Sequence, residues 1–210
     1  MEEPAVSFMI PNPESYFRDL IPARDDLLLD LEREALKENI PIVGPVVGGL
    51  LFILARVTKS KSILELGAAT GYSAVFMARG MEAPDSKLVT LEWDPDMARR
   101  TRENVAKAGL SDRVEVKNGD ATELLTAMTG PFDLIFMDIE KEDYAKVLSQ
   151  CHRLLKPGGM LVADNVAFQG ADAFNRDILA DGRWLTVHLY AFLPDHIPEH
   201  DGLALAVKIG

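Results

Sequence analysis

The sequence predicts an α/β fold in which helices cover both faces of a doubly wound, mostly parallel sheet of seven strands. Between residues 62 and 163, short apolar segments alternate with segments whose apolar residues recur at helical spacing. A glycine-containing turn, residues 67–71, follows the first apolar segment. Two further apolar segments, 184–189 and 203–209, close the chain. The alternation is typical of a parallel sheet, and the closing pair predicts a hairpin at one sheet edge.

Before the first strand, leucines recur at helical spacing among charged residues. This pattern predicts helices through most of residues 1–45, which we interpret as an N-terminal extension of a single domain spanning residues 1–210. Pro41 and Pro45 end this region, and the apolar segment 46–57 predicts a mostly buried helix.

The remaining elements follow in regular order. Proline in the first turn and glycine just past the end mark a helix over 95–108. The run Lys156-Pro157-Gly158-Gly159 is expected to stop a helix over 144–155. Further helices are expected at 72–79, 122–128 and 173–180, and strands at 62–66, 87–92, 113–117, 132–137 and 160–163.

The composition of the chain limits the binding partners and the cellular compartment that we expect. The net charge of −11, with scattered basic residues, argues against nucleic acid and anionic membranes. The one cysteine, Cys151, falls among apolar residues of a predicted helix, so we expect a core thiol and a reducing compartment. The first residues lack the positive charge of a signal peptide, and the uncharged run 39–55 is too short and too rich in proline and glycine to span a membrane. We therefore expect a soluble cytoplasmic protein.

Acidic residues stand at or just after the ends of almost all the predicted parallel strands. Ligands of such sheets bind at the carboxyl ends of the strands. The turn Gly67-Ala68-Ala69-Thr70-Gly71 has the spacing G-x-x-x-G rather than G-x-G-x-x-G, and Glu65 precedes it, which disfavours a pyrophosphate. S-adenosylmethionine, with a sulfonium, an ammonium and one carboxylate, suits an acidic rim better.

Each strand end then has an expected part in binding this cofactor. Glu65 is placed to pair with the ammonium, and Tyr72 with Ser73, opening a helix, to bind the carboxylate. Glu92 is placed to accept the ribose hydroxyls, and Asp120 with Ala121 to meet the adenine edge. Taken singly, the glycines could serve only the turn geometry, and Glu92 or Asp120 could be a helix N-cap or a surface acid.

A second group of oxygen ligands follows the fourth and fifth predicted strands. Asp138, Asp164 and Asn165 can converge in the cleft, and two carboxylates with an amide suit a hard cation such as Mg²⁺ or Ca²⁺. The alternative is that the aspartates are loop caps and that Asp164-Asn165 only opens a turn.

The chain resembles the cation-dependent catechol O-methyltransferase and caffeoyl-CoA O-methyltransferase family over roughly residues 40–210. The resemblance lies in Leu64-Glu65-Leu66-Gly67-Ala68-Ala69-Thr70-Gly71-Tyr72-Ser73-Ala74, in Leu161-Val162-Ala163-Asp164-Asn165-Val166 and in Asp201-Gly202-Leu203. It implies the Rossmann-like class I methyltransferase fold, O-methyl transfer to a small hydroxylated aromatic substrate, and a homodimer.

The resemblance also assigns roles position by position. Lys141 matches the catalytic lysine, which would accept the proton of an acceptor hydroxyl held on the metal. Without the resemblance, Lys141 reads as a solvated lysine that opens a helix. Asp138 is counted with the catalytic, cofactor and metal residues. The other cofactor contacts implied are Val43, Gly44, Glu65, Gly67, Tyr72, Ser73, Glu92, Asp120 and Ala121, and the metal ligands are Asp138, Asp164 and Asn165.

Departures from the family pattern concern the acceptor. The short segment after Asn165 favours a small acceptor, while Glu140 and Gln169 stand at positions that are aromatic or apolar in the catechol enzymes. Asp195 is one residue out of step with the glutamate that holds the second hydroxyl there. His196 and His200 flank the same loop, where either could contact the substrate, but we expect both to be exposed loop histidines.

Other functions stay open at this point. A member of the same family that methylates a hydroxylated base of tRNA is one alternative, although the net charge weighs against it. A cofactor-binding protein without catalysis is another, which an intact Lys141 disfavours, and a nicotinamide oxidoreductase is disfavoured by Glu65.

Overall fold

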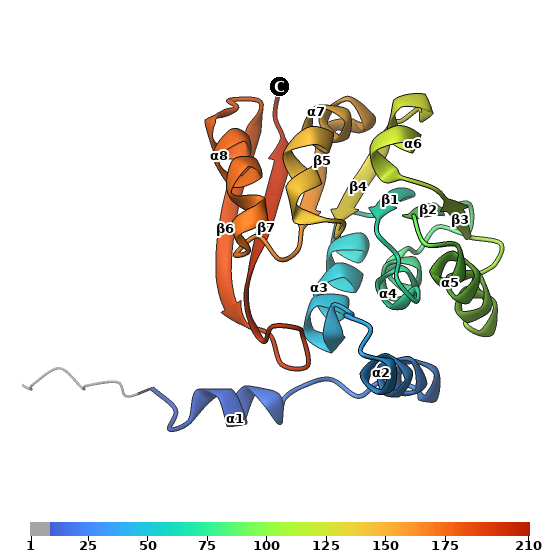
Figure 1. Ribbon diagram of the computed structural model, residues 1–210, viewed down its shortest axis with the longest axis vertical. Helices are drawn as coiled ribbons and strands as arrows, with labels where there is room; N and C mark the ends of the chain where they lie inside the picture. The colour runs from blue at the N-terminus through green and yellow to red at the C-terminus, as the bar shows by residue number, and fades with distance from the viewer. Residues whose placement is uncertain (1–8) are drawn as a thin grey trace, which may run out of the picture.

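The computed structural model describes residues 9–210, and its seven strands form one sheet of order β3-β2-β1-β4-β5-β7-β6 (Figure 1). Strands β1 to β5 pair in parallel, whereas β7 is antiparallel to both β5 and β6. This confirms the predicted doubly wound sheet with a closing hairpin at one edge. The strands are β1 (Ser62–Leu66), β2 (Lys87–Glu92), β3 (Val114–Asn118), β4 (Phe132–Met137), β5 (Leu155–Ala163), β6 (Trp184–Phe192) and β7 (His200–Lys208).

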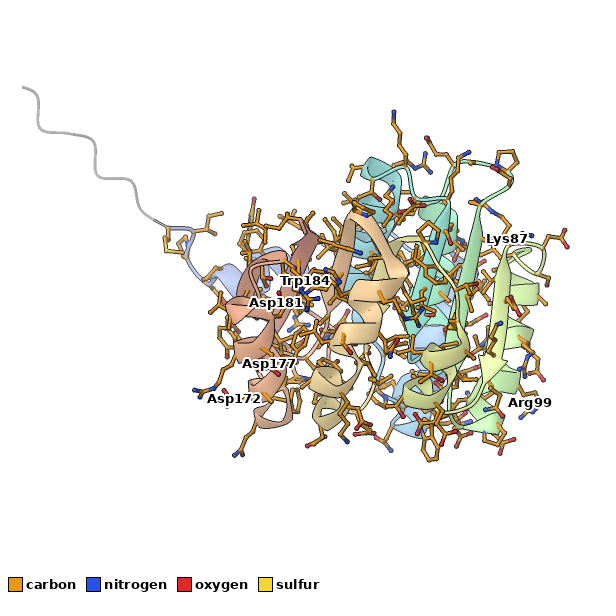
Figure 2. All side chains as sticks on the ribbon, turned by 90° about the horizontal axis from the view of Figure 1, so that it is seen from above. Lys87, Arg99, Asp172, Asp177, Asp181 and Trp184 are labelled. Atoms are coloured by element: carbon orange, nitrogen blue, oxygen red, sulfur yellow. The ribbon has the colours of Figure 1, made fainter. Side chains whose placement is uncertain are left out.

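Helices connect the strands and cover both faces of the sheet. The α-helices are α1 (Pro13–Arg18), α2 (Asp26–Glu38), α3 (Gly44–Val57), α4 (Tyr72–Gly80), α5 (Pro95–Lys107), α6 (Ala121–Ala127), α7 (Tyr144–Leu154) and α8 (Asp172–Ala180). Two short 3₁₀ turns, η1 (Lys141–Asp143) and η2 (Gln169–Ala171), lead into α7 and α8. Seen from above in Figure 2, α8 with Asp172 and Asp177 lies at one end of the molecule and α5 with Arg99 at the other.

Two apolar cores lie on the two faces of the sheet. Successive residues of a strand point to opposite faces, so neighbours such as Ile63 and Leu64 belong to different cores. The first core joins the strands to α6, α7 and α8, and it includes Cys151 at 0% exposure. The second joins them to α3, α4 and α5 and also includes Leu28 and Leu31 of α2. Burial raises the pKa of the Cys151 thiol to about 12, so Cys151 is a core residue as predicted.

Three boundaries differ from the predicted ones. Strand β5 begins at Leu155 instead of residue 160, because the Pro-Gly-Gly run is taken up by an irregularity of register opposite Phe132 and Leu134. Helix α3 begins at Gly44, before Pro45, since proline is compatible with the first turn of a helix. Strands β6 and β7 together extend to Phe192 and His200, which leaves only residues 193–199 as the loop of the hairpin.

The N-terminal region forms two separate helices along the lower edge of the sheet in Figure 1. Helix α2 is amphipathic and buries Leu28, Leu31 and Ala35, whereas α1 buries no side chain. The first eight residues of the predicted helical extension lie outside the described residues. Within residues 9–210, no helix has both the length and the apolar character needed to cross a membrane.

Candidate active site

A cavity of about 700 Å³ opens at the carboxyl ends of the parallel strands. Its walls come from the turns after β1, β2, β3, β4 and β5, from residues 39–43 before α3, and from the loop of the β6–β7 hairpin. Chain order explains this convergence, because every parallel strand delivers its next residues to the same edge of the sheet. The predicted site residues that line the cavity are Val43, Gly67, Tyr72, Ser73, Glu92, Asp120, Ala121, Asp138, Lys141, Asp164 and Asn165.

The glycine turn forms the floor of the cavity and requires its two glycines. Gly67 has φ 93° and Gly71 has φ 86°, a conformation that side chains disfavour. A Cβ on Gly67 would lie 2.1 Å from the carbonyl oxygen of Asp138. Both glycines therefore serve the geometry of the turn, and the missing side chain of Gly67 lets the residue after β1 lie against the residue after β4.

Glu92 links the end of β2 to the glycine turn. Its Oε2 accepts hydrogen bonds from the amides of Ala68 at 3.1 Å and Ala69 at 2.8 Å, and its Oε1 accepts one from the amide of Asp94 at 2.9 Å. The side chain is nearly buried, with 6% exposed. Glu92 therefore fixes the turn and also presents its carboxylate to the cavity.

Asp120 caps α6, as one of its two sequence interpretations predicted. Its Oδ1 accepts hydrogen bonds from the amide and the hydroxyl of Thr122, both at 2.7 Å, and these bonds lower the pKa of the carboxyl. The same residue lines the cavity beside Ala121, so capping and a place in the site coexist. Trp93, which the sequence analysis did not single out, lines the cavity next to Glu92 and is 72% exposed.

Glu65 lies behind the wall of the cavity instead of lining it. The carboxyl group is fully buried, and its Oε1 accepts a hydrogen bond from Ser73 Oγ at 2.5 Å. Among the described residues its Oε2 has no hydrogen-bond partner. Burial raises the pKa of Glu65 to about 7, although the hydroxyls of Ser73 and of Thr90, which lies opposite Glu65 on β2, act in the opposite direction. A buried acceptor without a donor fits a site that receives a cationic group.

Asp138 and Asp164 form the acidic end of the cavity, and each carboxylate faces a nitrogen. Lys141 Nζ donates to Asp138 Oδ1 at 2.9 Å and to the carbonyl of Ile139 at 3.0 Å. Burial and the charge of Asp164 raise the pKa of Asp138, and Lys141 only partly offsets them. Two carboxylates that repel one another in a buried place are suited to share a cation.

Asn165 completes the predicted metal set from the residue next to Asp164. Its Nδ2 donates to Asp201 Oδ2 at 2.6 Å, so the amide oxygen is the atom available to a cation. Asp201 is fully buried and also accepts from the amide of Gly202. In the part of the chain that the structure describes, no three aspartate, glutamate, histidine or cysteine side chains are gathered closely enough to hold a metal ion as they stand.

His196 is not the exposed loop histidine that the sequence predicted. It is 3% exposed, and its Nε2 lies 3.2 Å from Oδ1 and 3.0 Å from Oδ2 of Asp164. Burial alone would lower the pKa of His196, but the hydrogen bond and the charge of Asp164 outweigh it and raise the pKa. The position of His196 could have been inferred from the predicted hairpin. Strand β7 runs antiparallel to β5, so it begins near the carboxyl end of β5. The loop before it therefore reaches the cavity.

Four other predicted positions lie away from the cavity lining or outside the site. Gly44 sits behind Val43, where a Cβ would lie 2.6 Å from the carbonyl oxygen of Asp195. Asp195 is half exposed and binds Arg18 at 3.2 Å, so it does not face the cavity. Gln169 lines a separate surface hollow near α8, and His200 is exposed beside Glu14, as predicted. Of the acceptor-side residues considered, Glu140 lines the cavity.

The strand order with a reversed β7 is the class I methyltransferase fold, as solved structures show. An O-methyltransferase from Bacillus cereus in complex with S-adenosylhomocysteine is 29% identical with a TM-score of 0.84, over 93% of this chain and 96% of that one. An O-methyltransferase of Streptomyces achromogenes involved in tomaymycin synthesis, in complex with S-adenosylmethionine, is 28% identical with a TM-score of 0.85, over 94% and 96%.

The sequence comparisons give the family. The model of the O-methyltransferase family matches residues 22–186. A catechol O-methyltransferase of Niastella koreensis is 34% identical over 92% of this chain and 95% of its own length. A catechol O-methyltransferase of Sus scrofa is 34% identical over 83% of this chain and 96% of its own. The chain belongs to this family and is an S-adenosylmethionine-dependent O-methyltransferase, which confirms the resemblance found in the sequence.

Proposed function

We propose that the enzyme transfers the methyl group of S-adenosylmethionine to a hydroxyl of a small catechol-like or phenolic acceptor held on a divalent cation. Oxygen donors make Mg²⁺ the first candidate for that cation. The observation that carries the proposal is that one cavity is lined both by the glycine turn with Glu92 and by Asp138, Lys141, Asp164 and Asn165. A methyl donor at the first group and an acceptor at the second would lie side by side.

The cofactor half of the proposal rests on charge and hydrogen-bonding capacity. The unpartnered, buried Oε2 of Glu65 would accept from the ammonium of the cofactor, with Ser73 aligning the carboxylate. Tyr72 and Ser73 open α4, so their amides would bind the cofactor carboxylate. Glu92 would accept from the ribose, and Asp120 and Ala121 would border the adenine.

The acceptor half rests on the acidic end of the cavity. Asp138, Asp164 and Asn165 would hold the cation, which when bound lowers the pKa of the acceptor hydroxyl. In its neutral form Lys141 would accept the hydroxyl proton at Nζ and become the ammonium ion, which Asp138 at 2.9 Å is placed to pair with. Glu140 lines this end and makes it more polar than an apolar wall would, which favours an acceptor with further polar groups.

Replacing Glu65 by glutamine should weaken cofactor binding without destabilising the fold. The ammonium loses a charged partner, so affinity for S-adenosylmethionine should fall by about 1.5–3 kcal/mol. For the wild type, affinity should fall as pH drops below about 7, because Glu65 is then protonated. Isothermal calorimetry between pH 6 and 8 measures both, with Glu123→Gln on the exposed face of α6 as control.

In the absence of cofactor, Glu65→Gln should be more stable than the wild type. The pKa of Glu65 rises from 4.5 to about 7 on folding, so the wild type loses stability as pH rises across that interval. At about 1.4 kcal/mol per pKa unit, Glu65→Gln should be about 3 kcal/mol more stable at pH 8. Denaturant unfolding at pH 8 checks this. Unchanged affinity together with unchanged stability would remove Glu65 from the proposed site.

An acceptor screen tests the proposed reaction as a whole. The wild-type enzyme is incubated with methyl-labelled S-adenosylmethionine and a panel of catechols, single phenols, simple alcohols and unmodified or hydroxylated tRNA. Label transfer should occur to the vicinal aromatic diols, stop with EDTA and return with excess Mg²⁺. Transfer that continues after exhaustive chelation would contradict the cation, and transfer confined to tRNA would replace the small acceptor by a nucleic acid.

A further inference from the structure

His196 occupies a buried position against the proposed cation site, although it comes from the far end of the chain. Its Nδ1 lies 2.7 Å from the carbonyl oxygen of Pro198, and its Nε2 lies within 3.2 Å of both carboxylate oxygens of Asp164. Asp164 and His196 are 0% and 3% exposed. The imidazole and the carboxylate therefore meet away from bulk water.

The two contacts of the ring fix which nitrogen carries a proton. A carbonyl oxygen only accepts hydrogen bonds, so Nδ1 of His196 must be the N–H that donates to Pro198. In a neutral imidazole Nε2 then carries a lone pair, which points at the lone pairs of Asp164. Such an arrangement requires a positive charge shared by the two groups, either a proton or a metal ion. In histidines that bind a metal through one ring nitrogen, the other ring nitrogen usually donates its N–H to a backbone carbonyl, a carboxylate or water.

The loop that carries His196 is held in place from several sides. Within the loop, the amide of Leu193 donates to the carbonyl of Glu199 at 2.6 Å, and the amide of His196 donates to the carbonyl of Leu193 at 3.0 Å. Arg18 of α1 donates two hydrogen bonds, of 2.8 and 2.7 Å, to the carboxylate of Glu199. The backbone of the loop also packs against Gly44, so these contacts together fix the point from which the His196 side chain reaches Asp164.

We propose that His196 is a nitrogen ligand of the divalent cation, joining Asp164 and Asn165. The inference rests on the proposed function, since it presupposes a cation at these residues. Adjacent ligands of a six-coordinate ion with bonds of about 2.1 Å lie about 3.0 Å apart. The separation of Nε2 from the two oxygens of Asp164, 3.0 and 3.2 Å, equals that spacing and is also the length of the hydrogen bond that a protonated ring makes, so the experiment below decides whether a metal ion or a proton lies between the two groups.

A nitrogen ligand changes which ion the site prefers. Mg²⁺ is bound almost entirely by oxygen, whereas imidazole suits first-row transition ions. The site should therefore bind Mn²⁺ or Co²⁺ more tightly than Mg²⁺, and part of that preference should depend on His196. A site made only of Asp138, Asp164 and Asn165 would lack this dependence.

Electron spin-echo spectroscopy of the full-length protein loaded with Mn²⁺ tests the inference directly. The wild type should show coupling of Mn²⁺ to a ring ¹⁴N, which changes to the ¹⁵N pattern when histidine is isotopically labelled. The coupling should vanish in His196→Gln and persist in His200→Gln, a histidine that is exposed beside Glu14. Calorimetry should show that His196→Gln weakens Co²⁺ binding by at least ~10-fold and Mg²⁺ binding less.

The possible outcomes distinguish failure of His196 as a ligand from failure of the proposed cation-dependent reaction. Bound Mn²⁺ without nitrogen coupling in the wild type would overturn the role of His196 while leaving the cation-dependent reaction in place. Wild-type protein that binds no Mn²⁺ at all would overturn both. A wild-type spectrum without nitrogen coupling overturns the inference whether or not His196→Gln folds, and when coupling is present the two variants assign it to one of the four histidines.

Discussion

Lys141→Met should lower turnover by about 10²–10⁴, the usual contribution of a general acid or base, while cofactor affinity changes little. The reason is the position of Nζ, which lies 2.9 Å from Asp138 at the acidic end of the cavity, in a side chain that is 21% exposed. Lys141→Arg should not restore activity, because a guanidinium does not release its proton in this pH range.

A neighbouring lysine provides the matched control for Lys141. Lys146 lies one helical turn further on and pairs with Asp143, but its side chain is 66% exposed and does not line the cavity. Lys146→Met should leave both turnover and cofactor affinity at the wild-type level. Steady-state rates from pH 6 to 9 make the comparison. If Lys141→Met keeps most of its activity across that range, the cation alone would account for deprotonation and Lys141 would only neutralise Asp138.

Asp138→Asn should lower turnover by about 10²–10³ or more, because a misplaced cation gives up several kcal/mol of transition-state stabilisation. The substitution keeps the shape of the side chain and removes only its charge, and Asp164→Asn should act in the same way. Cofactor affinity should change much less than turnover, since Asp138 only borders the cofactor site and the charged cofactor partners Glu65 and Glu92 belong to other strand ends. Measured kcat and calorimetric affinity together distinguish a metal ligand from a cofactor contact.

A nearby acid of the same cavity controls for the general loss of negative charge. Asp143 also lines the cavity but pairs with Lys146, whose side chain is 66% exposed and does not line the cavity. Asp143→Asn should therefore retain turnover within a few-fold of the wild type. Equal losses in the variants of Asp138 and Asp143 would mean that the overall acidity of the cavity matters, and would count against a specific cation site.

Most of the fold could be predicted because it depends on patterns local to the chain. The alternation of apolar segments with amphipathic ones predicted the parallel strands, and the closing pair predicted the hairpin. The errors fell at boundaries, as where β5 begins at Leu155. The length of a strand depends on the strand it pairs with, which local sequence does not specify. The Pro-Gly-Gly run lies within β5 because the pairing with β4 shifts its register between Phe132 and Leu134.

By itself the sequence determined which residues follow each strand and hence which residues meet at the cavity. A strand end places the next side chains at one edge of the sheet whatever the loops do, so Glu92, Asp120, Asp138 and Asp164 could be placed from the chain alone. The glycines of the turn likewise follow from backbone conformation, which is a local property.

Only the tertiary structure decided the contacts between segments distant in sequence. His196 is 32 residues from Asp164, and its burial depends on how the hairpin loop closes against α1 and Gly44. Over shorter separations too, of eight residues for Glu65 and Ser73 and three for Asp138 and Lys141, packing fixes the side-chain directions that join the two partners. Periodicity carries no information on these distances, since loop closure and packing join residues whose order along the chain does not predict their separation.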